Sequence, residues 1–352
     1  MENYRIKKIT RLTKEYSHQW SNLWNSAPGA HFFNSLEHFI SFIDVFPATK
    51  YMIVFCYKKD ELVAILPLVW GYRFGIKTLL CIDSFGDSID RSSLCIKKQD
   101  PEILRFLIES ATEKKNNIFL AELEEKHLNL FMRNNMSIIK NCTFEFSCKS
   151  LRINFEKDLL ASMSKKTRKK FKKKIKKSED SMTFEFHRKE NAGDFQKMIE
   201  IEQKSWKSKK GIAIFQKDSA RNIYRSWIKN NNKNVGVAFL KKDNKEIACL
   251  FGMFANKTFL ITNIAFVSEF SKFTPGKILI FYVLRYLQKN GFNTVDFSVG
   301  DSKWKRDFSN QILKQYDFYF SKNLSVCIWW KSLLFIKGII KRITKLGNCP
   351  NG

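Results

Sequence analysis

The sequence predicts an α/β protein built from two similar units in tandem. A strand–turn–strand pattern occurs twice, as YMIVFCYKKDELVAILPLVW at residues 51–70 and as VGVAFLKKDNKEIACLFGMFANKTFLITNIAF at residues 235–266, and both first turns contain Lys-Lys-Asp. The β-branched and aromatic residues on either side are typical of half-buried strands. A helix and then a short strand are expected after each pattern, so both halves have the same order of elements.

The two expected helices begin in the same way. Asp100-Pro101 opens the segment 101–117, and Thr274-Pro275 opens the segment 275–291. A capping residue followed by proline at the first helical position is a common helix start. Short strands are expected at residues 118–123 and 292–298. We therefore divide the chain into an N-terminal unit (1–150), a C-terminal unit (151–325) and a tail (326–352).

The composition excludes several classes of protein. The chain has 352 residues, of which 44% are apolar and 27% are charged, so it can build two cores and is not a disordered polymer. With 14 glycines and 6 prolines it is neither collagen-like nor a proline-rich repeat. Its net charge of +28 favours anionic partners, namely nucleic acid, a phosphorylated ligand or an acidic membrane face.

The cysteines predict buried, reduced thiols in a cytoplasmic protein rather than disulfides or metal ligands. No pair has CxxC spacing, and with five histidines no metal-ligand pattern arises, so we expect no metal. The eight are Cys56, Cys81, Cys95, Cys142, Cys148, Cys249, Cys327 and Cys349. The N-terminus lacks the apolar segment of a secretory signal, and no stretch reaches the roughly 18 apolar residues of a spanning helix. We expect a soluble protein, or one attached peripherally at the inner membrane face.

A dense basic segment opens the C-terminal unit. Ten of the thirteen residues from Lys165 to Lys177 are Lys or Arg. Ser164 is a candidate helix cap, and Phe171 and Ile175 lie one turn apart on a helix, which is enough to dock it on a core. We expect a helix here. Its basic face either binds tRNA, other RNA or an anionic membrane, or is simply solvated.

The end of the chain is predicted to contain two strands at residues 311–330 and then a helix at residues 331–347. The helix has a basic amphipathic pattern. It either lies on anionic lipid or packs on the core with its basic face exposed to solvent. Its apolar residues are Leu333, Leu334, Ile336, Ile340 and Ile343, and its basic residues are Lys331, Lys337, Lys341, Arg342 and Lys345.

A candidate phosphate site lies at the start of the second predicted helix, in the segment SEFSKFTPGKILIF (268–281). Helix N-termini carry unpaired N–H groups and a partial positive charge, and Gly276 lets a ligand approach the backbone closely. Lys272 and Lys277 add positive charge. The alternative is an ordinary strand-to-helix turn. Glu102 takes the place of Gly276 in the first half and would repel a phosphate, so only the second half is expected to bind one.

Several segments together resemble the GNAT acyltransferase superfamily, and within it the tandem branch of CelD/BioF-like acetyltransferases, related to the FemABX aminoacyltransferases. After the Thr-Pro-Gly turn and its helix comes VDFSVGDSKWKRDFS (295–309). This run matches the branch's pattern of Asp-x-Gly/Ser-x-Gly, an acidic residue and an aromatic-Lys pair. The matching residues are Asp296, Ser298, Gly300, Asp301, Trp304 and Lys305. Segments 18–46, 162–180 and 199–215 also resemble the family, the last through Glu202, Trp206, Lys207 and Gly211. Thr274 departs from the family, which usually has glycine there.

The resemblance implies two tandem GNAT-like units, each a mixed, mostly antiparallel sheet flanked by helices. It implies transfer of an acyl group from acetyl-CoA or another acyl-CoA to an amine, such as an amino sugar or a cell-envelope or polysaccharide precursor held between the units. The residues expected to bind the donor are Ile264, Ala265, Phe266, Val267, Thr274, Pro275, Gly276, Lys277 and Ile278. The alternatives are FemABX-like aminoacyl transfer from charged tRNA, and a non-catalytic RNA- or membrane-binding protein.

The resemblance also implies roles for individual side chains. Asp301 and Glu202 are candidate bases, and Lys305 is a candidate anchor for an anionic acceptor. Asp301 could instead cap a helix, Lys305 could pair with Asp301, and Glu202 could face solvent. The residues expected to bind substrate are Trp206, Lys207 and Trp304, although Trp206 could equally be a core residue.

Overall fold

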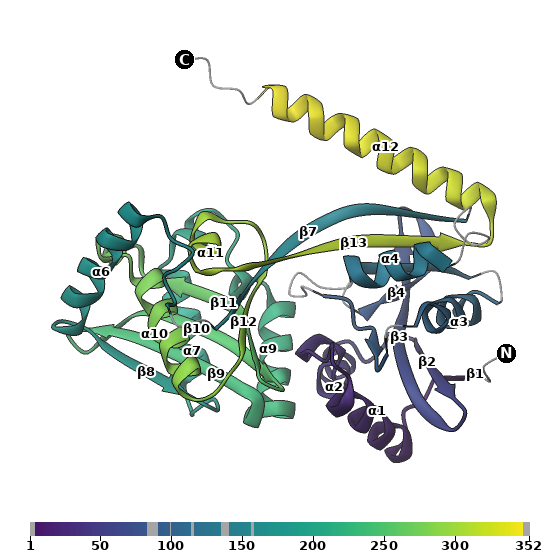
Figure 1. Cartoon of the computed structure of the whole chain (residues 1–352), viewed down its shortest axis with the longest axis horizontal. Helices are drawn as coiled ribbons and strands as arrows, with labels where there is room; N and C mark the ends of the chain where they lie inside the picture. The colour runs from purple at the N-terminus through teal and green to yellow at the C-terminus, as the bar shows by residue number, and fades with distance from the viewer. Residues whose placement is uncertain are drawn as a thin grey trace.

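The computed structural model describes residues 4–82, 91–98, 100–113, 116–134, 141–155 and 158–347. It is an α/β structure in which a mixed sheet runs through both halves of the chain, with helices on its faces (Figure 1). The predicted fold class is confirmed.

The N-terminal half contains β1 (Tyr4–Ile9), α1 (Lys14–Ser26), α2 (Leu36–Val45), β2 (Tyr51–Lys58), β3 (Glu61–Arg73), β4 (Ile76–Cys81), β5 (Cys95–Ile96), α3 (Pro101–Ala111), β6 (Asn117–Glu124), α4 (Glu125–Asn134) and β7 (Cys142–Asn154). The C-terminal half contains α6 (Lys165–Glu179), β8 (Thr183–His187), α7 (Asp194–Gln203), α8 (Trp206–Lys209), α9 (Asp218–Asn231), β9 (Val235–Lys242), β10 (Lys245–Ala255), β11 (Thr258–Phe266), α10 (Pro275–Lys289), β12 (Thr294–Val299), α11 (Lys303–Phe308), β13 (Gln311–Ser321) and α12 (Leu324–Gly347). Single 3₁₀ turns lie at Phe32–Asn34, Ile214–Gln216, Asn232–Asn234 and Ser268–Phe273.

The two halves share one element order, as the sequence predicts. Strands β2, β3 and β4 form an antiparallel meander, α3 crosses over, and β6 returns parallel to β4. Strands β9, β10 and β11, helix α10 and strand β12 repeat this arrangement. Even an irregularity is repeated, because Glu122 in β6 (φ 53°) and Ser298 in β12 (φ 63°) both have positive φ.

Two long strands join the halves (Figure 1). Strand β7 ends the N-terminal half but pairs with β12, whereas β13 lies near the end of the chain and pairs with β6. The two strands also pair with each other. The sheet order is therefore β1-β2-β3-β4-β6-β13-β7-β12-β11-β10-β9-β8, with β5 beside β3. Because the halves exchange strands in this way, the domain boundaries drawn above remain a prediction.

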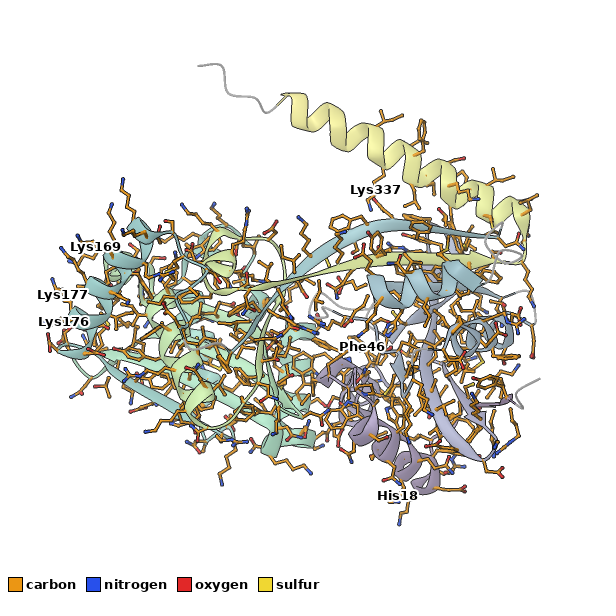
Figure 2. All side chains as sticks on the ribbon, in the orientation of Figure 1. His18, Phe46, Lys169, Lys176, Lys177 and Lys337 are labelled. Carbon is orange, nitrogen blue, oxygen red and sulfur yellow. The ribbon has the colours of Figure 1, made fainter. Side chains whose placement is uncertain are left out.

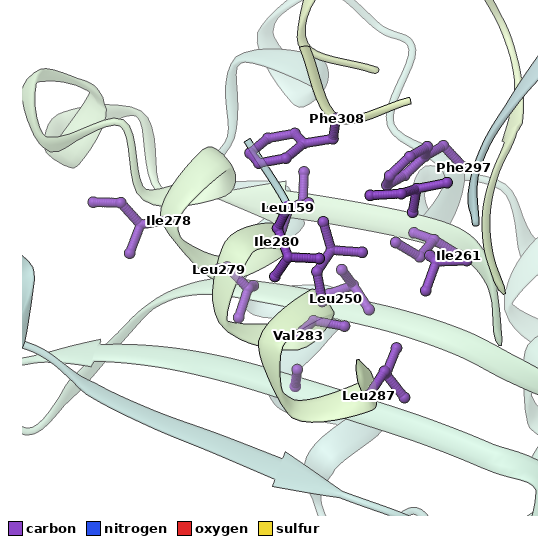
Figure 3. Packing of buried hydrophobic residues seen from close by; sticks show 14 of the residues in the cluster. Leu159, Leu250, Ile261, Ile278, Leu279, Ile280, Val283, Leu287, Phe297 and Phe308 are labelled. Atoms are coloured by element: carbon purple, nitrogen blue, oxygen red, sulfur yellow. The ribbon is translucent and has the colours of Figure 1, made fainter. Parts of the chain in front are cut away.

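Helices cover both faces of each half of the sheet. In the C-terminal half, α10 and α6 cover one face and α7 and α9 cover the other. Figure 3 shows the α10 side chains of Ile280, Val283 and Leu287 packed over Leu250 and Ile261 of the sheet. In the N-terminal half, α3 and α4 lie on one face and α1 and α2 on the other.

The halves also meet through α2 and α9, in an aromatic cluster. The Trp227 indole N–H donates to His38 Nδ1 at 3.2 Å, and both side chains are fully buried. Burial lowers the pKa of His38 to about 3, so the imidazole is a neutral acceptor at physiological pH. Phe32 packs edge-on against Trp227 with ring centroids 5.1 Å apart. Through this cluster α2 of one half packs against α9 of the other.

The basic segment forms the expected helix, α6. The Ser164 hydroxyl caps it by accepting from the Thr167 N–H at 3.4 Å. Phe171 and Ile175 are buried, whereas the lysines are exposed. Figure 2 shows Lys169, Lys176 and Lys177 pointing away from the body.

The prediction for residues 311–330 is half right. Strand β13 forms, but the second strand is wrong, because α12 begins at Leu324. Asn323 Oδ1 accepts from the Ser325 N–H at 3.0 Å, which starts the helix, and Cys327 and Trp330 turn onto the core. Among the described residues, none of the helices combines the length and the apolar character needed to cross a bilayer.

The thiols fit the expectation as far as the structure describes them. The seven described cysteines are free, and all but Cys148 are buried. Cys349, with the rest of residues 348–352, lies outside the described residues.

Candidate active site

A cavity of about 580 Å³ opens between β11 and β12. The two strands pair in parallel at three positions only, Thr258–Thr294, Phe259–Val295 and Leu260–Asp296. Beyond them the strands separate, and Ile261 on one side and Phe297 on the other begin the cavity lining. Positive φ at Ser298 and Gly300 takes β12 away from its neighbour. The lining comes from β11, the start of α10, the end of β12, α8 and α11.

Of the residues that the sequence predicts to bind the acyl donor, some line the cavity and others do not. Five line the cavity: Ile264, Phe266, Thr274, Gly276 and Lys277. The other four are not among the lining residues: Ala265, Val267, Pro275 and Ile278, of which Ala265, Pro275 and Ile278 are buried. The start of α10 and one edge of β11 therefore face the same space.

The start of α10 is not capped by the side chain of its N-cap residue. Thr274 adopts φ 56° and ψ 47°, the left-handed region that favours glycine, and its side chain makes no capping hydrogen bond to the described helix. A Cβ on Gly276 would lie 3.3 Å from Phe266 Cδ1. Lys174 of α6 donates to Thr274 Oγ1 at 3.4 Å, whereas Lys277 is paired with Asp307.

The residues expected to bind substrate all line the cavity. Trp206 is 41% exposed, so the alternative of a core residue is wrong. Trp304 packs edge-on against Phe297 with ring centroids 5.9 Å apart. Lys305 also lines the cavity, and its Nζ donates to the carbonyl oxygens of Ser298, at 3.3 Å, and Val299.

Lys207, Asn263 and Glu202 form a chain of polar contacts at the cavity wall. Lys207 Nζ donates to Asn263 Oδ1 at 3.0 Å, and Asn263 Nδ2 donates to Glu202 Oε1 at 3.1 Å. Glu202 is 1% exposed, so the alternative that it faces solvent is wrong, and Glu202 is not among the cavity-lining residues. Burial lowers the pKa of Lys207, and the Glu202 carboxylate, 3.8 Å from Nζ, only partly offsets this.

Asp301 lies outside the lining. Its carboxylate is 36% exposed and pairs with Arg306 at 2.8 Å and with Lys149 at 3.6 Å. The helix-cap alternative is wrong, because Ser302 is the N-cap of α11.

Sequence reasoning missed a buried charge cluster between the halves. Arg91 is 1% exposed; it pairs with Asp296 of β12, donates to Glu124 of β6 at 3.1 Å and donates to Ser150 Oγ at 2.6 Å. Arg152 of β7 donates to Asp296 at 2.6 Å. These charges are scattered singly along the sequence and only strand pairing brings them together. Asn263 was missed too, although a lone amide in the apolar run TFLITNIAF is a visible signal.

The charges in this cluster shift the pKa values of its two carboxylates. Burial alone would raise the pKa of Glu124, but the charges of Arg91, Lys126 and Arg152 outweigh it and hold the pKa far below its usual range. At Asp296, too, burial would raise the pKa, but the charges of Arg91 and Arg152 outweigh it and lower the pKa. Both carboxylates are therefore ionised, and they tie the two halves together. Among the described residues, no group of three or more His, Cys, Asp or Glu side chains is placed to hold a metal ion.

Comparison with known proteins agrees with this geometry. Residues 165–306, which contain the cavity, match the family model described as an acetyltransferase (GNAT) domain. Comparison with curated proteins finds no match. Among solved structures, FemX is similar at a TM-score of 0.66 and 13% identity, over 91% of this chain and 98% of that chain. L-PGS from Bacillus licheniformis is similar at a TM-score of 0.52 and 12% identity, over 88% and 97%. At such low sequence identity, these TM-scores show a shared fold alone. Residues 165–306 therefore match a GNAT acetyltransferase domain, and the chain has a fold that FemX shares along almost its whole length.

Proposed function

We propose that the chain transfers an acyl group from acyl-CoA to an amine, with the donor in the cavity between β11 and β12. The observation that carries the proposal is that this cavity joins an apolar split in the sheet to the start of α10. The split suits the extended, amide-containing arm of coenzyme A, and the helix start suits its pyrophosphate. Both features belong to the C-terminal unit.

The backbone of β11 supports a role in holding the thioester. The Val267 N–H donates to the Ile247 carbonyl at 2.9 Å, which places this residue's polar groups toward β10. Since backbone groups alternate in direction along a strand, those of Ile264 and Phe266 are directed toward the split. An N–H on that edge can donate to the thioester carbonyl and to the oxyanion that forms as the amine attacks.

The reaction needs a proton acceptor for the amine. The amine nitrogen bonds to the thioester carbon, the C–S bond breaks, and the thiolate leaves. We propose that Lys207 accepts the amine proton, because burial favours its neutral form. Glu202 then acts as a positioning residue, since it reaches Lys207 and Asn263 but not the cavity. Asp301, paired and partly exposed outside the lining, is expected to contribute little.

The test is binding of acetyl-CoA by calorimetry and by thermal shift, with heparin present as a competing polyanion. A carboxylate at Gly276, in the Gly276→Glu variant, should abolish binding while the protein stays folded. Gln288→Glu makes the same charge change at the penultimate residue of α10, at the other end of the helix, and is the control. Saturating ligand at about 100 times its dissociation constant should add about 2.7 kcal/mol of stability. Equal affinity of the two variants would refute the site.

Charged tRNA as the donor is a second candidate, supported by α6. All nine of its lysines are exposed, and five of them spread along the helix are chosen for the test: Lys165, Lys169, Lys172, Lys173 and Lys176. Changing all five to Gln should abolish transfer from charged tRNA and leave acetyl-CoA binding intact. The control changes five exposed lysines elsewhere, namely Lys14, Lys50, Lys229, Lys233 and Lys289. Transfer that survives the α6 variant would exclude this donor route. With either donor, we propose as acceptor an amino sugar or envelope precursor held between the units.

A further inference from the structure

Helix α12 presents an apolar face to solvent. Its inner side packs on the N-terminal half, where Trp330 is fully buried 5.5 Å from the Tyr319 ring and Cys327 is 2% exposed. Its outer side has six large apolar side chains that are 41–71% exposed: Leu324, Ile328, Trp329, Phe335, Ile336 and Ile339. We call these six residues the outer face of α12.

The outer face is a continuous stripe. Leu324, Ile328, Phe335 and Ile339 are separated by four, seven and four residues, which places them on one line along a helix. Trp329 and Ile336, seven residues apart, form a second line beside it. From Leu324 to Ile339 the stripe is about 22 Å long at 1.5 Å per residue. In Figure 1 the far end of the helix extends away from the rest of the chain.

The charges of α12 indicate which kind of partner binds the outer face. The helix contains Lys331, Lys337, Lys341, Arg342 and Lys345 and no acidic residue. Lys337 pairs with Glu145 of β7 at 3.0 Å, which anchors the helix to the body. A second copy of the same helix would bring like charges together, whereas an anionic lipid surface complements them. Tryptophan and phenylalanine beside lysine are also suited to the boundary between headgroups and acyl chains.

We propose that α12 docks the protein on an anionic lipid bilayer, lying along the surface with its outer face among the acyl chains and its net positive charge attracted to the anionic headgroups. This places an acyltransferase domain at a membrane surface, within reach of acceptors held there. The inference does not depend on the identity of the acyl donor.

The test is flotation of the full chain with vesicles of phosphatidylcholine containing about 30% phosphatidylglycerol, compared with pure phosphatidylcholine. The triple variant Phe335→Ser, Ile336→Ser, Ile339→Ser should lower partitioning onto anionic vesicles about 1,000-fold, since each large apolar side chain contributes about tenfold. The control triple Tyr72→Ser, Ile212→Ser, Ile312→Ser removes three side chains of 57–74% exposure elsewhere and should stay within about twofold.

A charge control separates docking from the general attraction of a protein of net charge +28. Changing Lys331, Lys341, Arg342 and Lys345 to Gln should weaken binding to anionic vesicles more than the same number of changes on α6, at Lys165, Lys169, Lys176 and Lys177. Equal losses from the two helices would overturn the assignment to α12. Equal flotation by the wild type and the apolar triple variant would also overturn it.

Two further measurements make the test independent of any one variant. In the wild type, vesicles with brominated acyl chains should quench tryptophan fluorescence, and Trp329→Phe should remove much of that quenching; unchanged quenching would contradict insertion of the outer face. Light scattering of the lipid-free chain should give a monomer. A dimer that the Phe335 triple variant dissociates would instead assign the outer face to a second copy and refute the proposal.

Discussion

Replacing Glu202 by glutamine tests the polar contacts behind the cavity with almost no change of shape. The carboxylate accepts from the Phe215 N–H at 2.7 Å and from Asn263 Nδ2 at 3.1 Å, and it faces Lys207 at 3.8 Å. An amide has one accepting oxygen, so it can serve only one of the two donors. Asn263 cannot turn its own amide round, because its oxygen already accepts from Lys207.

The expected cost of Glu202→Gln follows from these contacts. One buried donor loses its partner, which costs about 1–3 kcal/mol, and removing one member of a buried ion pair costs about 3–5 kcal/mol. Lys207 can lose its proton and so escape part of that second cost. We therefore expect a loss of about 3 kcal/mol in the free energy of unfolding at neutral pH. Glu200→Gln, on the exposed face of the same helix, should change it by less than about 0.5 kcal/mol.

The effect should also depend on pH. The Glu202 charge raises the pKa of Lys207, so its removal lowers that pKa further. Above both folded-state pKa values Lys207 is neutral in both proteins, and only the cost of the unpaired donor remains. Below them the variant must hold an uncompensated ammonium group, so the destabilisation grows as the pH falls. Urea unfolding from about pH 9 to about pH 6 measures this. Equal losses in Glu202→Gln and Glu200→Gln, or a loss independent of pH, would refute the reasoning.

Three further predictions concern the cavity and the charge cluster. Thr274→Gly should raise the unfolding free energy by up to about 1 kcal/mol, because left-handed backbone costs a non-glycine residue about 1–2 kcal/mol and the added flexibility costs about 0.5–1 kcal/mol; a lower melting temperature would contradict it. The carboxylate Glu124, whose folded-state pKa is depressed, contributes stability above about pH 4 that is lost on acidification, so stability should fall less steeply with acid in Glu124→Gln than in the wild type; equal slopes in urea titrations would count against the cluster. Lys207→Met should lower kcat about 100-fold, whereas Asp301→Asn should stay within about threefold, and the opposite order in steady-state kinetics would return the role of base to Asp301.

The parts of the fold that sequence patterns predict well are those determined by neighbouring residues. Asp100-Pro101 and Thr274-Pro275 start α3 and α10 at the expected residues, because a cap and a fixed proline φ act within one turn. The paired Lys-Lys-Asp turns lie between β2 and β3 and between β9 and β10 as expected. The basic helix α6 was predictable for the same reason, since Ser164, Phe171 and Ile175 all act within its own length.

What the sequence did not predict depends on partners far along the chain. The exchange of β7 and β13 between the halves depends on which strand edges pair, β7 with β12 and β13 with β6. No pattern of neighbouring residues specifies this pairing. The contact between Arg91 and Asp296 exists only because of that exchange. The second of the two strands expected within residues 311–330 is the start of helix α12 instead. Its Trp330 is fully buried in the core of the N-terminal half, a contact that only the folded chain creates.

The comparison of α3 with α10 gives a physical reason to expect an anion at only one of these two helix starts. At the start of α3, Asp100 Oδ1 accepts from the Glu102 N–H at 3.0 Å, and Glu102 itself pairs with Arg105. The positive end of that helix is therefore already neutralised by carboxylates of the protein. At the start of α10, the cap is Thr274, whose side chain does not bond to the described helix backbone, and Gly276 takes the place of Glu102. An anion at this position would supply the negative charge that Asp100 and Glu102 supply in the other half. One helix start of the duplicated unit is thus neutralised by its own side chains, whereas the other lacks these carboxylates, as the proposed division between a binding copy and a supporting copy requires.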